Sequence, residues 1–185
     1  MITNIDHVIL LWIENHLRYD FITPFWKLIT LFSEHGLFWI ALCVLLLIFK
    51  KTRKIGIVMA IAMIVNALIV NVWIKNMVAR VRPYDAYDDI IRLIGIQSDF
   101  SFPSGHTSVA FSSVMALQLA VGKKQKKYIR VLWILAFLIG FSRLYLGVHY
   151  PSDVLCGALI GTLSAVIANW IVKKWIIKDR PECSL

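Results

Sequence analysis

The chain has 185 residues, of which 59% are hydrophobic and 17% are charged, and its mean hydropathy is +0.72. A soluble domain averages about 45–50% apolar and about 25% charged residues, so this composition excludes intrinsic disorder and is too apolar for one water-soluble core. The net charge of +9 comes from Lys and Arg that gather in short clusters between apolar runs, which indicates membrane orientation rather than a nucleic-acid partner. Three cysteines are too few for a disulfide scaffold, and an integral membrane protein remains.

The first 35 residues are predicted to form either an interfacial helix or a first span. Residues 8–13 are apolar, but polar residues follow before Pro24: Glu14, Asn15, His16, Arg18 and Asp20. We expect no signal peptide, because a cationic leader and a small-residue cleavage site are both missing. An amphipathic helix in the membrane interface fits better than a sixth span, although a tilted helix covered by protein would tolerate the same polar residues.

Five later stretches are predicted to span the membrane, since a span needs about 20 mostly apolar residues. Three of them, 55–74, 107–122 and 154–172, lack formal charge along their whole length. The other two are 36–49, extended backwards through 28–33, and 131–142, extended to cover 128–146. The predicted fold is therefore an all-α polytopic membrane helical bundle of five to six transmembrane helices, with residues 1–185 as a single domain.

Basic residues set the predicted orientation, because short cytoplasmic loops carry more Lys and Arg than external loops do. Three basic regions alternate with the apolar runs, at 50–54, 123–130 and 173–180. If all three are cytoplasmic, the connections 79–105 and 143–151 lie outside and the C-terminus lies inside. We predict a multi-pass protein of the plasma (cytoplasmic) membrane, with an extracytoplasmic site.

The first polar motif follows the span 55–74 and reads Lys75-x4-Arg80-x-Arg82-Pro83. Its cations lie on the side of the membrane where the positive-inside rule disfavours them. Taken alone, Lys75 and Arg82 could be snorkelling anchors at the end of a span. Pro83 is expected to end the helix.

The second motif, Phe102-Pro103-Ser104-Gly105-His106, opens the next apolar run. Ser104 suits an N-cap, and Gly105 lets a ligand approach the backbone closely. Exposed N–H groups at a helix N-terminus form an anion site, and His106 would lie at its edge. The alternative is an ordinary cap beside an interfacial histidine.

The third motif, Ser142-Arg143-x5-His149-x-Pro151-x-Asp153, joins the last two spans. Pro151 suits the first turn of a helix, where Asp153 could simply complement the helix dipole. A carboxylate near a histidine can instead fix its tautomer and raise its basicity. The spacing leaves a contact between His149 and Asp153 open, because Pro151 implies a turn between them.

The predicted topology brings all three motifs to the outer ends of the helices. They supply two histidines, one carboxylate and a helix N-terminus. They also supply the three cations Lys75, Arg82 and Arg143. Cations and N–H donors suit a phosphoryl group, whose transition state spreads negative charge over its equatorial oxygens. Two histidines supply a nucleophile and a proton donor. A metal site is less natural, since the histidines lack H-x3-H spacing and the cations would repel a metal ion.

Lys75-x6-Arg82-Pro83, Pro103-Ser104-Gly105-His106 and Ser142-Arg143-x5-His149-x3-Asp153 resemble the tripartite signature of the type 2 phosphatidic acid phosphatase superfamily. That superfamily includes membrane lipid phosphatases and soluble vanadium haloperoxidases. All signature positions match in order over residues 75–153. The small size is similar to that of bacterial undecaprenyl-diphosphate phosphatases, in which an Asp often stands in the place of Gly105, and of phosphatidylglycerophosphate phosphatases.

This resemblance implies a role for each signature residue. His149 attacks phosphorus in line and forms a phosphohistidine, Asp153 orients His149, and His106 protonates the leaving oxygen. The phosphate would be held by Lys75, Arg82, Ser104, Gly105 and Arg143. The chemistry of the superfamily requires no metal and no other cofactor.

We therefore predict an integral membrane enzyme that hydrolyses a lipid phosphate or diphosphate. Undecaprenyl diphosphate is the first choice of substrate, and phosphatidylglycerophosphate or phosphatidic acid is the second. The expected partners are this substrate and membrane lipids, without nucleic acid. A rival interpretation is an anion transporter that uses the cationic cluster as a binding site. The enzyme is favoured because the charged residues lie at one face instead of lining a path across the bilayer.

Three further features are interpreted without a catalytic role. The carboxylates of the external loop are expected to be solvated rather than to bind a divalent cation: Asp85, Asp88 and Asp89. Asn66 and Asn71 lie inside a span and are expected to satisfy each other or a neighbouring helix. The pair Gly157-x3-Gly161 is expected to let two helices pack closely.

Overall fold

The computed structural model describes residues 2–122 and 125–176, and every regular element in these ranges is a helix. The α-helices are α1 (Ile2–Leu17), α2 (Thr23–Leu31), α3 (Leu37–Ile48), α4 (Arg53–Ala67), α5 (Lys75–Val78), α6 (Pro83–Ala86), α7 (Gly105–Ala120), α8 (Lys126–Tyr145) and α9 (Pro151–Ile171). A 3-10 turn, η1 (Glu34–Gly36), and two π-helical segments, η2 (Leu68–Ile74) and η4 (Val172–Ile176), complete them. Several residues used to predict the orientation lie outside the described ranges: Lys123, Lys124, Lys178, Arg180 and the C-terminus.

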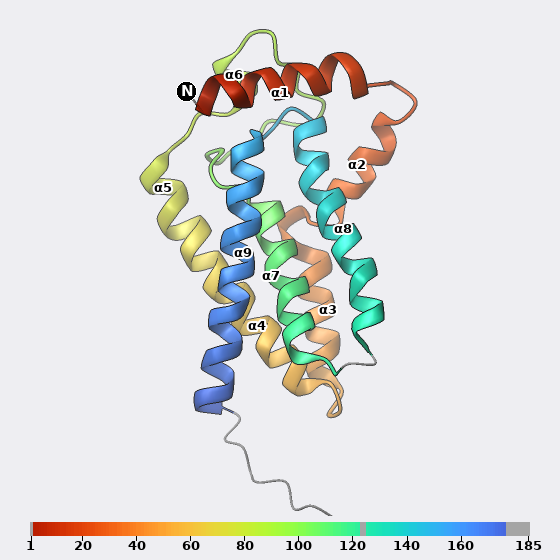
Figure 1. Ribbon diagram of the computed structural model, residues 1–185, viewed down its shortest axis with the longest axis vertical. Helices are drawn as coiled ribbons and strands as arrows, with labels where there is room; N and C mark the ends of the chain where they lie inside the picture. Colours follow the sequence, from red (N-terminus) through yellow and green to blue (C-terminus); the bar gives the residue numbers. More distant parts are fainter. Residues whose placement is uncertain (1, 123–124, 177–185) are drawn as a thin grey trace, which may run out of the picture.

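The long helices run side by side as a bundle, with α7 inside it (Figure 1). Four described stretches are long and apolar enough to cross a membrane: Thr23–Ile48, Arg53–Ala86, Lys126–Tyr145 and Pro151–Trp175. Helix α7 has 16 residues, fewer than the roughly 20 that a span needs, and packs against α9, α4 and α8. The predicted all-α membrane bundle is confirmed, whereas the number of five to six spans is not.

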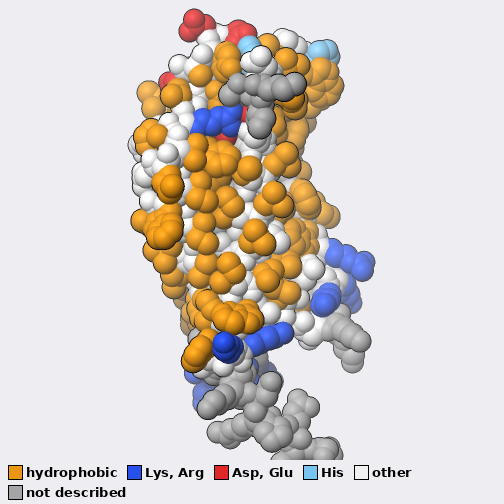
Figure 2. All heavy atoms as spheres, turned by 60° about the vertical axis from the view of Figure 1, so that its left-hand side comes forward, with side chains coloured by type: hydrophobic (Ala, Val, Ile, Leu, Met, Phe, Trp, Pro, Cys, Tyr) orange, Lys and Arg blue, Asp and Glu red, His pale blue; other side chains and the backbone are white. Residues whose placement is uncertain are grey.

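The outer surface of the bundle is apolar. On α9, Leu155, Leu159 and Leu163 follow one another at four-residue spacing and are each at least 60% exposed. Hydrophobic side chains cover the middle of the face shown in Figure 2. Most of the Lys and Arg on this face lie at the lower end, a smaller blue patch lies near the upper end, and Asp and Glu lie at the upper end. An apolar surface this continuous needs a lipid solvent, as the composition predicted.

One predicted span contains a break. Residues 28–33 and 36–49 were expected to form one helix, but α2 and α3 are separated by η1, where His35 and Gly36 have φ angles of 49° and 70°. These left-handed conformations end one helix and start the next. Ser33 at this break donates its hydroxyl to the carbonyl oxygen of His106, over 3.0 Å, so the break lies against the start of α7.

The predicted span 55–74 is helical throughout and continues into α5. Helix α4, η2 and α5 form one uninterrupted run, because the residues at both junctions keep right-handed helical angles. The run ends at Ala79, which has a φ of 46° and donates its N–H to the carbonyl oxygen of Lys75. Lys75 is thereby fixed in the last turn.

Close packing of α7 against α9 confirms the predicted role of the glycine pair. A Cβ on Gly157 would lie 2.7 Å from the carbonyl oxygen of Ser104, and one on Gly161 would lie 2.2 Å from that of Ser108. Only glycine permits this approach. Asn66 on α4 donates to the Ser108 hydroxyl of α7 over 3.2 Å, so its amide N–H pairs with a neighbouring helix as expected, whereas its buried Oδ1 atom has no partner among the described residues. Asn71 is exposed and lines the larger cavity instead.

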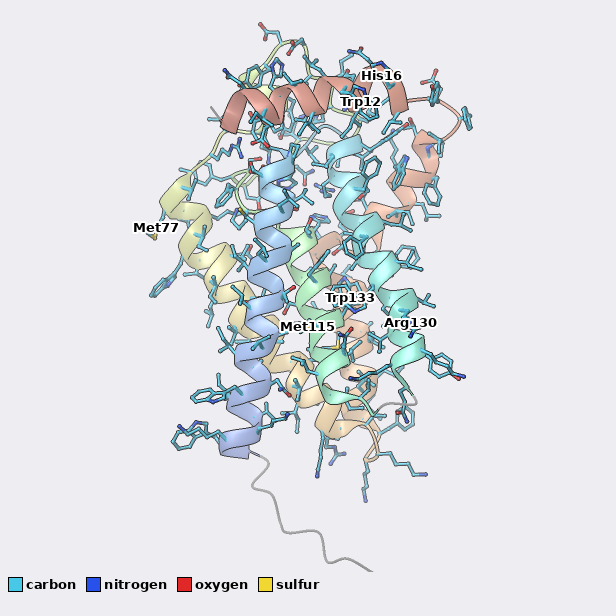
Figure 3. The ribbon with its side chains drawn as sticks, viewed as in Figure 1. Trp12, His16, Met77, Met115, Arg130 and Trp133 are labelled. Carbon is cyan, nitrogen blue, oxygen red and sulfur yellow. The ribbon has the colours of Figure 1, made fainter. Side chains whose placement is uncertain are left out.

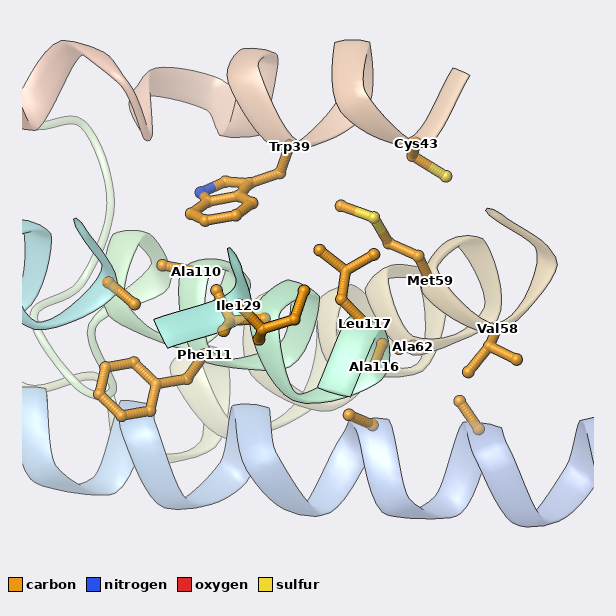
Figure 4. Close-up of a cluster of buried hydrophobic side chains, with 14 of the residues drawn as sticks. Trp39, Cys43, Val58, Met59, Ala62, Ala110, Phe111, Ala116, Leu117 and Ile129 are labelled. Carbon is orange, nitrogen blue, oxygen red and sulfur yellow. The ribbon is translucent and has the colours of Figure 1, made fainter. Parts of the chain in front are cut away.

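The main hydrophobic core is shared by α3, α4, α7, α8 and α9, and Figure 4 shows part of it. Trp39 and Met59 are fully buried there, and they pack with Leu117 and Ala62. From α8, Trp133 packs against Phe111 of α7 and donates to Gln118 over 2.5 Å; Figure 3 shows its position beside α7. This core holds α7 rigidly below its polar N-terminus.

Helix α1 lies across one end of the bundle, at a steep angle to the long helices (Figure 1). Trp12 and His16 stack on each other at 5.2 Å along it (Figure 3). Arg18, just after α1, donates to the carbonyl oxygens of Tyr145 and Ile91 over 2.8 Å. The helix therefore covers the end that carries the motifs, in the orientation that an interfacial helix would adopt.

Candidate active site

The three motifs meet at the end of the bundle that α1 covers. Helices α5 and α8 end at this end of the bundle, and helices α7 and α9 begin at it (Figure 1). The backbone N–H of Ser104 donates to the carbonyl oxygen of Asp153 over 3.0 Å, which joins the second motif to the third. Residues far apart in the sequence thus surround one site.

Two adjoining cavities open at this end. The larger, of about 600 Å³, is lined by the signature residues Lys75, Arg82, Gly105, His106 and His149. Apolar side chains from α3, α4 and α7 line the same cavity: Ile40, Met63 and Val109. A second cavity, of about 390 Å³, is lined by His106 and Arg143 among others. His106 therefore faces both.

His149 and Asp153 lie together behind the cavity wall. The Nδ1 atom of His149 is 3.4 Å from Oδ2 of Asp153, a long contact of the kind that tightens when substrate binds. Asp153 is fully buried and is held by two further donors on Oδ2, the Ser101 hydroxyl at 2.5 Å and the Tyr150 N–H at 3.0 Å. A carboxylate placed in this way favours the Nδ1–H tautomer of His149 and leaves the Nε2 lone pair toward Arg82.

His149 is buried among charges that keep it neutral. Burial lowers its pKa to about 4, and Arg82 and Arg143 act in the same direction, which together outweigh the opposing effect of Asp153. The residue lies in the connection between α8 and α9. At neutral pH its imidazole is therefore an unprotonated base with a free lone pair.

Arg82 connects this histidine to the cavity. Its Nη1 atom is 3.3 Å from Nε2 of His149 and donates to the carbonyl oxygen of Val148 over 2.7 Å. The side chain is 4% exposed, and Pro83, in the first turn of α6, fixes the chain direction after it. Its guanidinium therefore lies within reach of any group that Nε2 of His149 could attack.

The N-terminus of α7 forms another wall. Ser104 is the N-cap, and its hydroxyl accepts from the N–H of Thr107 at 3.5 Å and from the Thr107 hydroxyl at 2.9 Å. Ser104 is fully buried and lines neither cavity, so its hydroxyl is committed to the cap. A Cβ on Gly105 would lie 3.7 Å from Nζ of Lys75, so the backbone of Gly105 and the ammonium face the same space.

Arg143 is buried at the end of α8, on the other side of His106. Its Nη1 atom donates to the Thr30 hydroxyl over 2.6 Å, and its Nη2 atom donates to the amide oxygen of Gln97 over 3.2 Å. Thr30 belongs to α2, so the break between α2 and α3 helps to position this cation. Arg143 reaches the site from the second cavity, whereas Lys75 and Arg82 reach it from the first.

Sequence reasoning missed a carboxylate in the centre of the site. Asp99 forms ion pairs with Lys75 and with Arg82, and its Oδ1 atom is 2.6 Å from Nη2 of Arg82. It lines the larger cavity. The sequence predicts an external connection over 79–105 with solvated carboxylates at Asp85, Asp88 and Asp89, and no motif spacing marks Asp99 within it. Its role depends on how the loop folds back over α5.

The second residue missed is Arg80, which was noted as an external cation without a role. Its Nη1 atom is 2.6 Å from Oδ1 of Asp153, and its Nη2 atom is 2.7 Å from Oδ2 of Asp6 on α1. The guanidinium also lies 3.7 Å from the centre of the Tyr150 ring. Its placement on the side where cations are disfavoured was the one signal that could have revealed it.

The loop carboxylates have no part in this site. Asp89 pairs with His7 of α1 over 2.9 Å, and Asp85 and Asp88 are exposed. Within residues 2–122 and 125–176, no group of three or more His, Cys, Asp or Glu side chains is arranged to hold a metal ion.

The chain is similar in sequence and in structure to known proteins. Residues 51–177, which include all three motifs, match the sequence family described as the PAP2 superfamily. An undecaprenyl-diphosphatase of Sulfolobus acidocaldarius is 34% identical over 149 residues, which cover 79% of this chain and 70% of that protein. The crystal structure of the first transmembrane PAP2-type phosphatidylglycerolphosphate phosphatase from Bacillus subtilis is similar at a TM-score of 0.77 and 27% identity, covering 96% of this chain and 89% of that one. The structure of LpxE from Aquifex aeolicus is similar at a TM-score of 0.75 and 28% identity, covering 86% and 92%.

Proposed function

The chain belongs to the PAP2 superfamily and is a membrane lipid phosphatase, and from this premise we propose that it converts undecaprenyl diphosphate to undecaprenyl phosphate through a phosphohistidine on His149. The observation that carries the proposal is the position of the neutral His149, with Asp153 behind Nδ1 and Arg82 at Nε2. A nucleophile, its orienting carboxylate and a phosphate-binding cation are thereby aligned.

In the first step, Nε2 of His149 forms a bond to the terminal phosphorus while the bond from phosphorus to the bridging oxygen breaks. Burial and the neighbouring cations lower the pKa of His106 well below its ordinary value in the empty site, and binding of the anionic diphosphate raises it again. His106, protonated in the complex, gives its proton to that oxygen, and undecaprenyl phosphate leaves. Asp153 stabilises the positive charge that develops on the His149 ring. Lys75, Arg82 and Arg143 stabilise the equatorial oxygens, together with the N–H of Gly105. Ser104 contributes by capping the helix that presents this N–H.

In the second step, water attacks the phosphorus of the phosphohistidine, and His106 takes a proton from that water. The bond between phosphorus and Nε2 then breaks, which releases inorganic phosphate and returns His149 to its neutral form. The three cations supply the positive charge that a divalent metal would otherwise supply, so the proposed reaction is independent of metal.

The shape of the larger cavity supports a lipid substrate. It runs from the cations and histidines to apolar side chains of α3, α4 and α7, so a phosphorylated headgroup and the start of an apolar chain fit one continuous space. The name of the Sulfolobus relative favours undecaprenyl diphosphate. The Bacillus structure is named for a phosphatidylglycerolphosphate phosphatase, which makes phosphatidylglycerophosphate the second candidate, followed by phosphatidic acid.

The proposal includes an extracytoplasmic active site and a cytoplasmic C-terminus. Lys50, Lys51, Arg53 and Lys54 lie around the turn between α3 and α4, at the end of the bundle opposite the site. Lys126 and Lys127 open α8 at that same end. The positive-inside rule places this end in the cytoplasm. A carrier lipid released at the outer face after glycan transfer would then meet the enzyme directly.

A substrate panel tests the proposal. Purified protein in detergent should release phosphate from undecaprenyl diphosphate faster than from phosphatidylglycerophosphate or phosphatidic acid, and EDTA should not reduce the rate. Orthovanadate should inhibit, because its trigonal bipyramid resembles the phosphoryl transition state. A strict requirement for a divalent metal, or a clear preference for another lipid, contradicts the corresponding part of the proposal.

A further inference from the structure

Three cations assigned to phosphate binding are already paired with acceptors from one short segment. The carboxylate of Asp99 accepts from Nζ of Lys75 and from Nη2 of Arg82, the latter over 2.6 Å. Two residues earlier, the amide oxygen of Gln97 accepts from Nη2 of Arg143 over 3.2 Å. The segment 97–99 therefore supplies oxygen atoms to the same donors that a phosphoryl group would use.

Asp99 resembles a bound anion more than a structural support. Its two carboxylate oxygens bridge two different cations, as two oxygens of a phosphate would. The side chains of Lys75 and Arg82 are 7% and 4% exposed, whereas that of Asp99 is 50% exposed. The cations are thus fixed in the protein, and the carboxylate reaches them from the open side of the cavity.

The backbone of the same residue is held independently of its carboxylate. The carbonyl oxygen of Asp99 accepts from Nε of Arg82 over 2.9 Å. The side chain can therefore leave the cations by rotation while the segment stays anchored. Burial by itself would raise the pKa of Asp99, but Lys75 and Arg82 together lower it below its ordinary value. The carboxylate is consequently charged at neutral pH.

A carboxylate and a phosphate cannot share these two cations. Both are anionic, both need the same donors, and like charges at such close range repel strongly. We propose that Asp99 is an internal competitor of phosphate, which pairs with Lys75 and Arg82 in the empty site, is displaced when the substrate phosphoryl group binds, and returns when inorganic phosphate leaves. This inference rests on the proposed function, in which Lys75 and Arg82 hold the phosphate.

The competitor sets the affinity of the site for its product. Two nearly buried cations with no anion between them would bind inorganic phosphate tightly and slow its release. An internal carboxylate weakens binding of every phosphate ligand by the cost of its own displacement. The transition state makes interactions that inorganic phosphate lacks, and these offset the cost of displacing Asp99. Inorganic phosphate is therefore released faster, and the turnover rate rises.

Asp99→Asn tests the inference, because it removes the charge and keeps both the size of the side chain and the backbone acceptor for Arg82. Inhibition constants for inorganic phosphate and orthovanadate would be measured on the purified protein with a lipid phosphate substrate. We expect both constants to fall by about tenfold, within the range usual for coupled binding equilibria. Asp88→Asn, which removes the same charge from an exposed position of the same connection, should leave both constants unchanged.

A second variant, Asp99→Ala, is made in parallel, and a thermal-shift measurement with phosphate shows whether each variant is folded. A folded variant that binds phosphate more tightly is stabilised at a lower phosphate concentration. If the constants rise or stay unchanged in a folded Asp99 variant, Asp99 supports the cations and does not compete, and the inference is wrong. If the purified wild-type protein releases no phosphate from any lipid phosphate or diphosphate, the proposed function itself fails.

Discussion

His149 is buried between Arg82 and Asp153, and its protonation state decides whether it can act as the proposed nucleophile. Its pKa of about 4 means that the lone pair on Nε2 is free above that pH and occupied by a proton below it. We therefore expect kcat/KM to show no loss from protonation of His149 between pH 7 and pH 5, and to fall as the pH approaches 4.

A pH profile on the purified enzyme checks this, with a second substrate of different phosphate pKa as the control. If the pH at which a limb of the profile is centred changes with the substrate, that limb reports ionisation of the substrate. If it stays the same for both substrates, the limb reports ionisation of the enzyme. An acid limb of the enzyme centred near 6.5, the ordinary value for histidine, would show that burial does not keep His149 neutral. A loss of activity toward higher pH has the opposite sign and reports the proton on His106.

Arg80 links the carboxylate behind His149 to α1. Arg80→Ala leaves Asp153 buried without its charged partner, so we expect kcat to fall by about tenfold or more, because a misplaced positioning group disturbs in-line attack. KM should change less, since Arg80 lines neither cavity. Arg80→Lys should recover part of kcat, because it restores the charge at Asp153 without the second arm to Asp6. A loss confined to KM would place Arg80 in substrate binding instead.

The signature residues of the site could be predicted because each lies within a short motif. Their convergence followed from the predicted topology alone, since every motif borders a helix at the same end of the bundle. Asp99 and Arg80 could not be assigned in this way. Their partners are 17 to 74 residues away in the chain, and only the path of the connection 87–104 and the position of α1 bring them together.

At the scale of the elements, the packing of α9 against α7 holds His149, in the loop before α9, beside the N-terminus of α7. A Cβ at position 161 would lie 2.2 Å from the carbonyl oxygen of Ser108 and 3.0 Å from the N–H of Ser112, and backbone cannot yield as a side chain would. Gly161→Ala should therefore cost about 1–3 kcal/mol of stability, as overpacked interiors do, and should lower activity with it.

Thermal unfolding in detergent measures this effect. Gly95→Ala is the matched control, because a Cβ at position 95 would meet nothing within 4 Å. An unchanged melting temperature for Gly161→Ala would mean that the two helices are not in close contact.

The helices themselves were largely predictable, because uninterrupted apolar runs of sufficient length determine them. The expected extension of 131–142 over 128–146 agrees with α8, which spans Lys126–Tyr145. The break between α2 and α3 could not be predicted, since apolar residues continue on both sides of it. Only His35 and Gly36, through their left-handed backbone, produce it.

At the scale of the whole molecule, the orientation in the membrane decides which leaflet supplies the substrate. In a variant lacking Cys43, Cys156 and Cys183, the substitutions Asp88→Cys and Gln125→Cys would be made separately. Both positions are exposed and lie at opposite ends of the bundle. A membrane-impermeant maleimide applied to intact cells should label position 88 and spare position 125.

Permeabilised cells provide the control, since both positions should then react. The reverse pattern in intact cells would place the site in the cytoplasm, and recycling of a carrier lipid at the outer leaflet would then be excluded.

The central claim is that His149 carries the phosphoryl group during turnover, and trapping that group tests it most directly. Protein quenched during hydrolysis of a lipid diphosphate labelled in its terminal phosphate should hold an acid-labile, base-stable label on the peptide that contains His149. His149→Ala should lose the label together with nearly all activity, while protein abundance and lipid binding persist. A His149→Ala variant that keeps more than about a tenth of the wild-type rate, or a label found on another residue, would contradict the account.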